Sequence, residues 1–146
     1  MLPDHAGTYV LALKLLHPAT VGAGRLGCFQ FPAGWYAYAG SARGPGGLAA
    51  RISRHLRSPK PLRWHVDYLR VYAQPVEVWS AIGIQKRECA WAEALARLPG
   101  ASIPAPRFGA SDCHCPGHLI HLSELPDVVA FAHAVGEPVS QERLNA

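Results

Sequence analysis

The sequence lacks a run of eighteen uncharged apolar residues, the length that a membrane-spanning helix needs, so we expect no membrane association. Its first ten residues, MLPDHAGTYV, lack the basic and then apolar segments of a secretory signal, so we expect a cytoplasmic protein. In that compartment the four cysteines are expected to be reduced thiols rather than two disulfides. A length of 146 residues, nearly half of them apolar, suits one domain over residues 1–146.

Acidic residues are almost absent from one part of the chain. Between Arg43 and Arg70 the only acid is Asp67, whereas seven of the fourteen Lys and Arg residues lie there. Such an excess of positive charge is typical of a surface that binds a phosphate-bearing partner, although a solvated face gives the same pattern. We expect contacts with nucleic-acid phosphates from Arg43, Arg54, Arg57, Lys60 and Arg63.

Hydrophobic periodicity predicts strands first and helices later in the chain. Strands are expected over residues 7–15, 35–40 and 76–84, with a glycine-rich hairpin connection around residues 21–34. Helices are expected over residues 48–56, 62–72, 87–98 and 124–135, the second on weaker periodicity. This order indicates an α+β fold in which hairpin-linked strands form a small sheet packed against helices.

Two of these helices carry polar residues beside or within their apolar stripe. On residues 48–56, Arg51 and His55 lie four apart along the stripe, whereas Arg54 and Arg57 point toward solvent. The pair is either functional or a snorkelling arginine beside a boundary histidine. On residues 87–98, Glu88 shares a face with apolar side chains, where a carboxylate needs a cation or hydrogen bonds. Its first-turn position offers the alternative of an exposed acid that complements the helix dipole.

Five landmarks resemble, in their order, the motifs of the GIY-YIG nuclease superfamily. They are GTY at residues 7–9, YAG at residues 38–40, Arg51, His55 and Glu88. The segments YAYAGSARGPGGLAARISRHL, RWHVDYL and FGASDCHCPGHL are more closely similar to the domain-of-unknown-function 123 branch. The superfamily resemblance covers residues 7–98, the expected core, and leaves residues 99–146 as a branch-specific C-terminal extension.

The resemblance implies a three-stranded antiparallel sheet flanked by helices, and a metal-dependent endonuclease that acts on nucleic acid, with DNA expected. Tyr9 and Tyr38 match the tyrosines that position or deprotonate the attacking water. Arg51 matches the arginine that neutralises the scissile phosphate, and His55 matches a position held by tyrosine or histidine. Glu88 matches the carboxylate that holds Mg²⁺ or Mn²⁺. The branch also occurs fused to a DNA-repair glycosylase, which implies a functional link to such an enzyme.

The sequence departs from the superfamily pattern in ways that keep a second interpretation open. Many relatives carry an asparagine downstream of the glutamate, but the only asparagine here is Asn145. Thr8 and Ala39 replace the isoleucines of the two strand motifs. Because a fold does not fix a function, the alternative is a catalytically inactive nucleic-acid-binding module of the same fold.

A cysteine-bearing segment, SDCHCPGH at residues 111–118, suggests a structural zinc site. The candidate ligands are Cys113, Cys115 and His118, with Cys89 or His114 as the fourth. The Cys-x-Cys spacing is tighter than in most zinc sites, so a polar loop beside the sheet is the alternative. Asp112 and His114 are also candidates to support the active site in place of the asparagine.

Two further patterns lie within the basic stretch between Arg43 and Arg70. His65 and Asp67 lie two residues apart, so they would diverge on a helix and share a role only on extended backbone. Gly44, Gly46 and Ala49 fit a G-x-G-x-x-A dinucleotide-binding fingerprint, with Asp67 about twenty residues on. The missing βαβ units count against that interpretation.

Overall fold

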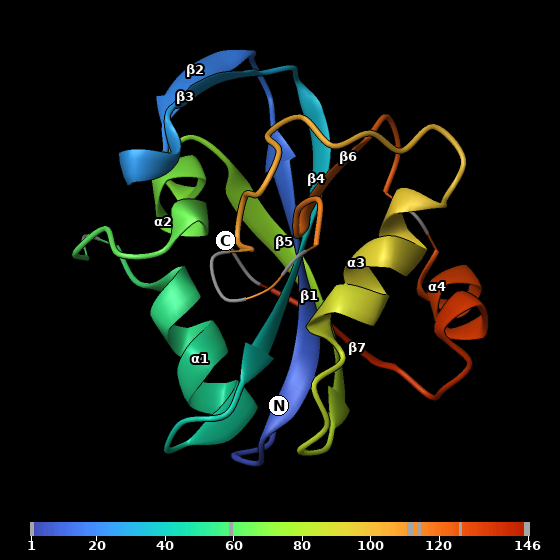
Figure 1. Ribbon diagram of the computed structural model, residues 1–146. Coiled ribbons are helices and arrows are strands. Elements are labelled where there is room, and N and C mark those ends of the chain that lie inside the picture. Colours follow the sequence, from blue (N-terminus) through green and yellow to red (C-terminus); the bar gives the residue numbers. More distant parts are fainter. Residues whose placement is uncertain (1, 59, 111–112, 114, 126, 145–146) are drawn as a thin grey trace.

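The computed structural model describes residues 2–58, 60–110, 113, 115–125 and 127–144 (Figure 1). Its strands are β1 (Gly7–Leu15), β2 (Ala19–Gly22), β3 (Cys28–Phe31), β4 (Gly34–Ala42), β5 (Gln74–Ile82), β6 (Leu119–Leu122) and β7 (Ser140–Arg143). Its helices are the 3-10 helix η1 (Gly24–Leu26), α1 (Gly47–Leu56), α2 (His65–Arg70), α3 (Glu88–Ala96) and α4 (Val128–Val135). The elements expected from periodicity are all confirmed, with ends that shift by a few residues.

The α+β class is confirmed, but the expected three-stranded sheet is wrong. Within the described residues an antiparallel sheet of five strands has the order β6-β4-β1-β5-β7, and β2 and β3 form a separate two-stranded sheet. The three expected strands form its centre, where β1 pairs with β4 on one side and β5 on the other. The additional strands β6 and β7 pair with the outer edges of β4 and β5. Both come from the C-terminal part of the chain, which thus completes the central sheet.

Helices cover both faces of this sheet, with α1 and α2 on one side and α3 and α4 on the other (Figure 1). Successive side chains of β1 therefore enter two different cores. Tyr9 and Leu11 pack in a cluster with residues of α1 and α2, whereas Val10 packs in a cluster with residues of α3 and α4. Of the helices that the structure describes, none is both long enough and apolar enough to cross a membrane.

The turn before α1 does not form a dinucleotide site. Gly46 takes a left-handed conformation, with φ of 84°, and α1 follows directly. The first free amides of the helix, on Leu48 and Ala49, donate hydrogen bonds of 2.9 Å to the carbonyls of His5 and Pro3. These amides are the groups that would bind a diphosphate, and the sheet beside them is antiparallel rather than parallel. The dinucleotide interpretation is therefore wrong.

Candidate active site

A pocket of about 480 Å³ opens where β1 and β4 face the first turn of α3 and the side of α1. Four of the five expected catalytic residues line it, namely Tyr9, Tyr38, Arg51 and Glu88. Further lining residues are Gly40, Ser41, Arg43, Arg63, Trp64, His65, Lys86, Cys89, Gly109, Cys113 and His118. The structure thus gathers side chains that are up to 109 positions apart in the sequence around one hollow.

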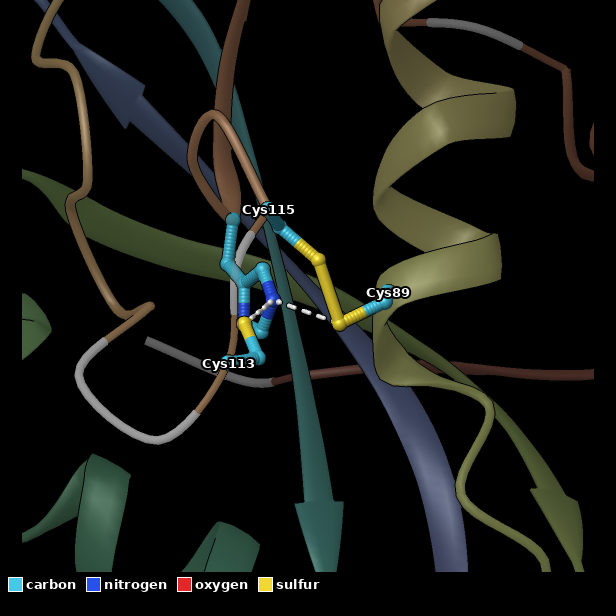
Figure 2. Close-up of side chains that lie close together, drawn as sticks. Cys89, Cys113 and Cys115 are labelled. Carbon is cyan, nitrogen blue, oxygen red and sulfur yellow. Dashed lines mark hydrogen bonds between the residues drawn. A yellow bond between two sulfur atoms is a disulfide. The ribbon is translucent and has the colours of Figure 1, made fainter.

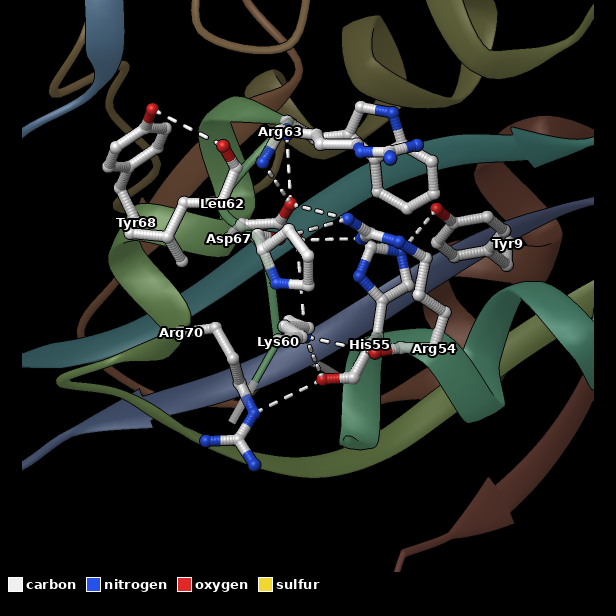
Figure 3. A network of polar contacts seen from close by, with 11 residues as sticks. Tyr9, Arg54, His55, Lys60, Leu62, Arg63, Asp67, Tyr68 and Arg70 are labelled. Atoms are coloured by element: carbon white, nitrogen blue, oxygen red, sulfur yellow. Dashed lines mark hydrogen bonds and ion pairs between the residues drawn. The ribbon is translucent and has the colours of Figure 1, made fainter. Parts of the chain in front are cut away.

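The fifth expected residue, His55, lies behind the pocket wall. Its Nε2 atom is 2.7 Å from the Tyr9 hydroxyl, and its side chain is buried between β1 and α1 (Figure 3). Burial, followed by the positive charge of Lys60, lowers the pKa of His55 to about 3. The imidazole is therefore neutral at neutral pH. Within the described residues its other nitrogen, Nδ1, has no hydrogen-bond partner.

The two tyrosines lie on neighbouring strands, with ring centroids 6.5 Å apart. Burial raises the pKa of Tyr38 to about 12, although the Arg51 guanidinium opposes this shift. Burial and then the neighbouring Tyr38 raise the pKa of Tyr9 well above its ordinary value, and Arg51 again opposes. Both phenols are therefore protonated at neutral pH and act as hydrogen-bonding groups.

Gly40 leaves the space that the Tyr9 ring occupies. The two residues face each other across the β1–β4 pair, and a Cβ atom added at Gly40 would lie 2.5 Å from the Tyr9 hydroxyl oxygen. No side chain fits there without moving the phenol. The glycine of the YAG segment is thus required by the position of a tyrosine on the neighbouring strand.

Arg51 reaches the pocket along the face of an indole ring. Its guanidinium lies 4.3 Å from the centroid of the Trp64 ring, and the Arg54 guanidinium lies 3.9 Å from the same centroid. Such cation–π contacts hold an arginine side chain in place while leaving its N–H groups available. Sequence reasoning missed Trp64, although a tryptophan directly before a helix in the basic stretch was a usable signal.

Arg54 does not point toward solvent, as its position on α1 suggested. Its two terminal nitrogens each donate a 3.0 Å hydrogen bond to the carboxylate of Asp67, which is fully buried (Figure 3). The backbone amides of Arg63 and Trp64 also donate to Asp67. Burial alone would raise the pKa of Asp67, but the hydrogen bonds from Arg54 and the two amides lower it below its ordinary value. The helix wheel missed this partner, because it lies thirteen residues further along the chain.

Lys60 is also engaged inside the protein. Its side chain is 5% exposed and donates hydrogen bonds to the carbonyls of Arg54 and His55, in the last turn of α1. Arg70 donates to the His55 carbonyl as well. Cations at this helix end complement its dipole, and burial lowers the pKa of Lys60 to about 8. Lys60 therefore serves as a helix cap.

The remaining expected phosphate contacts are exposed. Arg43 and Arg63 line the pocket together with Lys86, a basic residue that sequence reasoning did not select. Arg57 is exposed beyond the end of α1 and does not line the pocket. Among the described lining residues, Arg51 brings the number of Lys and Arg cations to four, against one carboxylate, Glu88.

Glu88 is the first residue of α3 and is half-buried at the pocket wall. Its Oε2 atom is buried, and no group in the part of the chain that the structure describes gives it a hydrogen bond. A carboxylate oxygen in that condition is costly unless a cation or water occupies the hollow before it. Carboxylate oxygen is also the protein ligand that Mg²⁺ and Mn²⁺ prefer, so Glu88 fits a divalent-cation ligand.

His65 and Asp67 diverge, as expected for a helix. The His65 Nδ1 atom accepts a 2.7 Å hydrogen bond from the Gly109 amide and so ties α2 to the loop at the opposite pocket wall. Asp67 turns the other way, toward Arg54. The other residues considered for support of the site, Asp112 and His114, lie outside the described residues, as does the single asparagine, Asn145.

Cys89, Cys113, Cys115 and His118 form a cluster beside Glu88. One ligand atom from each lies within 4.8 Å of those of the others. Figure 2 shows the Cys89 and Cys115 sulfurs joined as a disulfide, so the expectation of reduced thiols is wrong for this pair in the structure. Cys113 and the exposed Cys28 are free.

Comparison with known proteins gives one match. A family model described as "Domain of unknown function DUF123" matches residues 8–140, nearly the whole chain. No curated protein and no solved structure matches.

Proposed function

The chain belongs to the DUF123 family, and we propose that it is a divalent-metal-dependent endonuclease of the GIY-YIG type, with DNA as the expected substrate. The observation that carries this proposal is the buried Oε2 of Glu88, which has no hydrogen-bond partner among the described residues and lies in the same pocket as Arg51, Tyr9 and Tyr38. A pocket lined by such a carboxylate oxygen and by several guanidinium groups suits a phosphate that binds together with a divalent cation. The resemblance of GTY, YAG, Arg51, His55 and Glu88 to the GIY-YIG motifs supports the same assignment.

Each side chain has a role that its surroundings allow. Arg51, held against Trp64, donates hydrogen bonds to the non-bridging oxygens of the phosphate, where negative charge develops during cleavage. Tyr9 and Tyr38 are protonated phenols that hold the attacking water by hydrogen bonds.

His55 acts on the water through Tyr9. We assign to the neutral imidazole the tautomer with its proton on Nδ1, in which Nε2 accepts the hydrogen bond of the Tyr9 hydroxyl. This interaction orients the phenol and leaves the oxygen lone pairs of Tyr9 directed to the pocket, where they accept a hydrogen bond from the water. His55 is therefore a positioning residue.

Glu88 would hold the divalent cation. When bound, Mg²⁺ or Mn²⁺ supplies a hard positive charge that neutralises phosphate oxygens and lowers the pKa of a coordinated water. The exposed Arg43, Arg63 and Lys86 surround the pocket mouth and bind flanking phosphates.

The proposal is tested with a panel of labelled single-stranded, duplex, branched and damaged DNA, and matching RNA, incubated with Mg²⁺, Mn²⁺ or a chelator. We expect cleavage that needs the metal and that Glu88→Gln abolishes. Glu93→Gln is the matched control, because Glu93 lies on the same helix but is exposed at a surface ion pair with Arg97. Metal-independent cleavage, or equal cleavage by Glu88→Gln, would overturn the assignment. Binding without cleavage across the whole panel would instead favour the inactive binding module.

A further inference from the structure

A cluster of three cysteines and one histidine forms part of the wall of the proposed catalytic pocket, and the proposed cleavage mechanism gives it no role. Cys89 is the second residue of α3, and the other three members come from the loop that leads into β6. Their four ligand atoms lie within 4.8 Å of one another. Figure 2 shows the three cysteines of this cluster close together. We propose that, in its reduced form, this cluster is a zinc site that fastens the C-terminal loop to α3.

The nitrogen-to-sulfur distances fit a tetrahedral metal site. The Nε2 atom of His118 lies 3.5 Å from the Cys89 sulfur and 3.4 Å from the Cys113 sulfur. With Zn–S near 2.3 Å and Zn–N near 2.0–2.1 Å, a tetrahedral site separates nitrogen from sulfur by about 3.6 Å. The histidine nitrogen thus already lies at nearly the separation from two cysteine sulfurs that a shared zinc ion requires.

The donor set is that of a structural zinc site. Three sulfurs and one imidazole nitrogen make four ligands, which close the coordination of zinc and leave no open position for substrate. A disulfide between Cys89 and Cys115 uses only two of these donors. It does not account for the convergence of Cys113 and His118 on the same place, whereas a zinc ion accounts for all four residues.

The loop that carries three of the ligands is held in shape by one arginine. Arg107 takes a left-handed conformation, with φ of 67°, and its guanidinium donates to the backbone carbonyls of Ala110, Cys113 and Cys115. The backbone of His118 is fixed between Phe108 and Ala39 of β4. Such outer contacts orient ligands before the metal binds, as the supports of known metal sites do.

The chemistry balances in two steps. Reduction of the Cys89–Cys115 bond takes two electrons and two protons from a dithiol reductant, which itself becomes a disulfide. Zn²⁺ then displaces the protons of the three thiols, and His118 binds as a neutral imidazole. The disulfide form cannot hold the metal with full coordination, because two of the ligands are no longer thiolates.

Metal content of the reduced full chain tests the site. The protein is treated with a phosphine reductant, given Zn²⁺, and passed through gel filtration with a weak chelator before elemental analysis. We expect one zinc per chain, and replacement by Co²⁺ should give the intense thiolate-to-cobalt absorption of a tetrahedral site. Cys113→Ser should weaken zinc binding by more than about tenfold. Removal of a residue that only supports a metal ligand already lowers affinity by about 10-fold to 100-fold, and Cys113 is a ligand itself.

Two matched variants separate this site from other cysteines and from the catalytic pocket. Cys28→Ser makes the same chemical change at an exposed cysteine outside the cluster and should retain one zinc. Glu88→Gln should also retain one zinc, because Glu88 is not a ligand of the cluster. The zinc site can therefore be present whether or not the protein is a nuclease. No zinc in the reduced wild type, or equal affinity in Cys113→Ser, would overturn the proposal. If Cys113→Ser does not fold, the cobalt spectrum of the wild type tests the site by itself. A spectrum of octahedral cobalt without thiolate bands would overturn the zinc proposal.

Discussion

The hydroxyl of Tyr9 and the Nε2 atom of His55 lie 2.7 Å apart in the protein interior, and this contact joins the central strand β1 to α1. Through it, a residue of the pocket is oriented by a residue that does not line the pocket. Residues 9 and 55 are far apart in the sequence, so the contact exists only in the folded chain.

Buried His55 makes folding stability depend on pH. The unfolded imidazole takes up a proton near pH 6.5, whereas the folded one, with its pKa lowered to about 3, does not, so the unfolded state binds more protons between these values. This contribution to stability is complete above pH 6.5 and is lost as the pH falls toward 3. Urea unfolding measures the free energy of unfolding at each pH. Between pH 4 and 6 we expect this free energy to rise less steeply with pH in His55→Gln than in the wild type, by about 1 kcal/mol per pH unit. An imidazole NMR titration that places the pKa of His55 near 6.5 would contradict this.

The Arg54–Asp67 pair is expected to contribute strongly to stability. Asp67→Ala leaves the Arg54 guanidinium and two backbone amides without their buried acceptor, which should lower the free energy of unfolding by about 3–5 kcal/mol. Glu93→Ala removes one partner of an exposed ion pair on α3 and should cost less than about 1 kcal/mol. Urea denaturation measures both. Equal losses of unfolding free energy in the two variants would show that the buried pair stabilises the protein no more than the exposed one.

Gly40 and Gly44 provide a matched pair of glycine-to-alanine changes. A methyl group at Gly40 would lie 2.5 Å from the Tyr9 oxygen, so Gly40→Ala should displace the phenol and destabilise the protein by about 1–3 kcal/mol. At Gly44 no atom of the described residues outside the adjacent chain lies within 4 Å of the added atom, and the change should stay within about 0.5 kcal/mol. Gly40→Ala should also lose cleavage activity, whereas Gly44→Ala should keep it. Wild-type activity in Gly40→Ala would mean that the Tyr9 position is not required.

Exposed and buried cations of the basic stretch should behave differently toward nucleic acid. Arg63→Ala should weaken binding at all sequences and lower the slope of log affinity against log salt by about 1. Lys60→Met should leave this slope unchanged but destabilise the protein by about 1–2 kcal/mol, because Lys60 caps α1. Fluorescence anisotropy over a salt series and urea unfolding check the two effects. A lowered salt slope in Lys60→Met would show instead that Lys60 contacts nucleic-acid phosphates.

The sequence predicted the centre of the sheet better than its edges. β1 and β5 are long and rich in apolar residues, so their periodicity is clear. β6 has four residues, and β7, with the sequence SQER, is polar and largely exposed. These strands form because their backbones pair with the edges of β4 and β5. Local patterns of four residues carry no signal for such long-range pairing.

In the candidate site too, contacts within one helix could be predicted from the sequence, whereas contacts between distant segments could not. Helical spacing predicted that Arg51 and His55 lie side by side, and this follows from the geometry of α1 alone. It gave the wrong direction for Arg54, whose partner Asp67 is on another helix, and it did not predict the indole of Trp64 beside both arginines. Periodicity assigns a side chain to a face of its own helix, but only tertiary packing decides what meets it there.

The role of Arg51 in cleavage is measured by the single-turnover rate of Arg51→Ala, taken together with its affinity for the same DNA. If Arg51 stabilises the charge that develops on the phosphate, the rate should fall about 100-fold or more, while affinity changes by only a few-fold. Arg97→Ala is the control, since Arg97 is 80% exposed on the α3 side and does not line the pocket. A rate for Arg51→Ala equal to that of the wild type would show that Arg51 does not stabilise the transition state and that this pocket is not a nuclease active site.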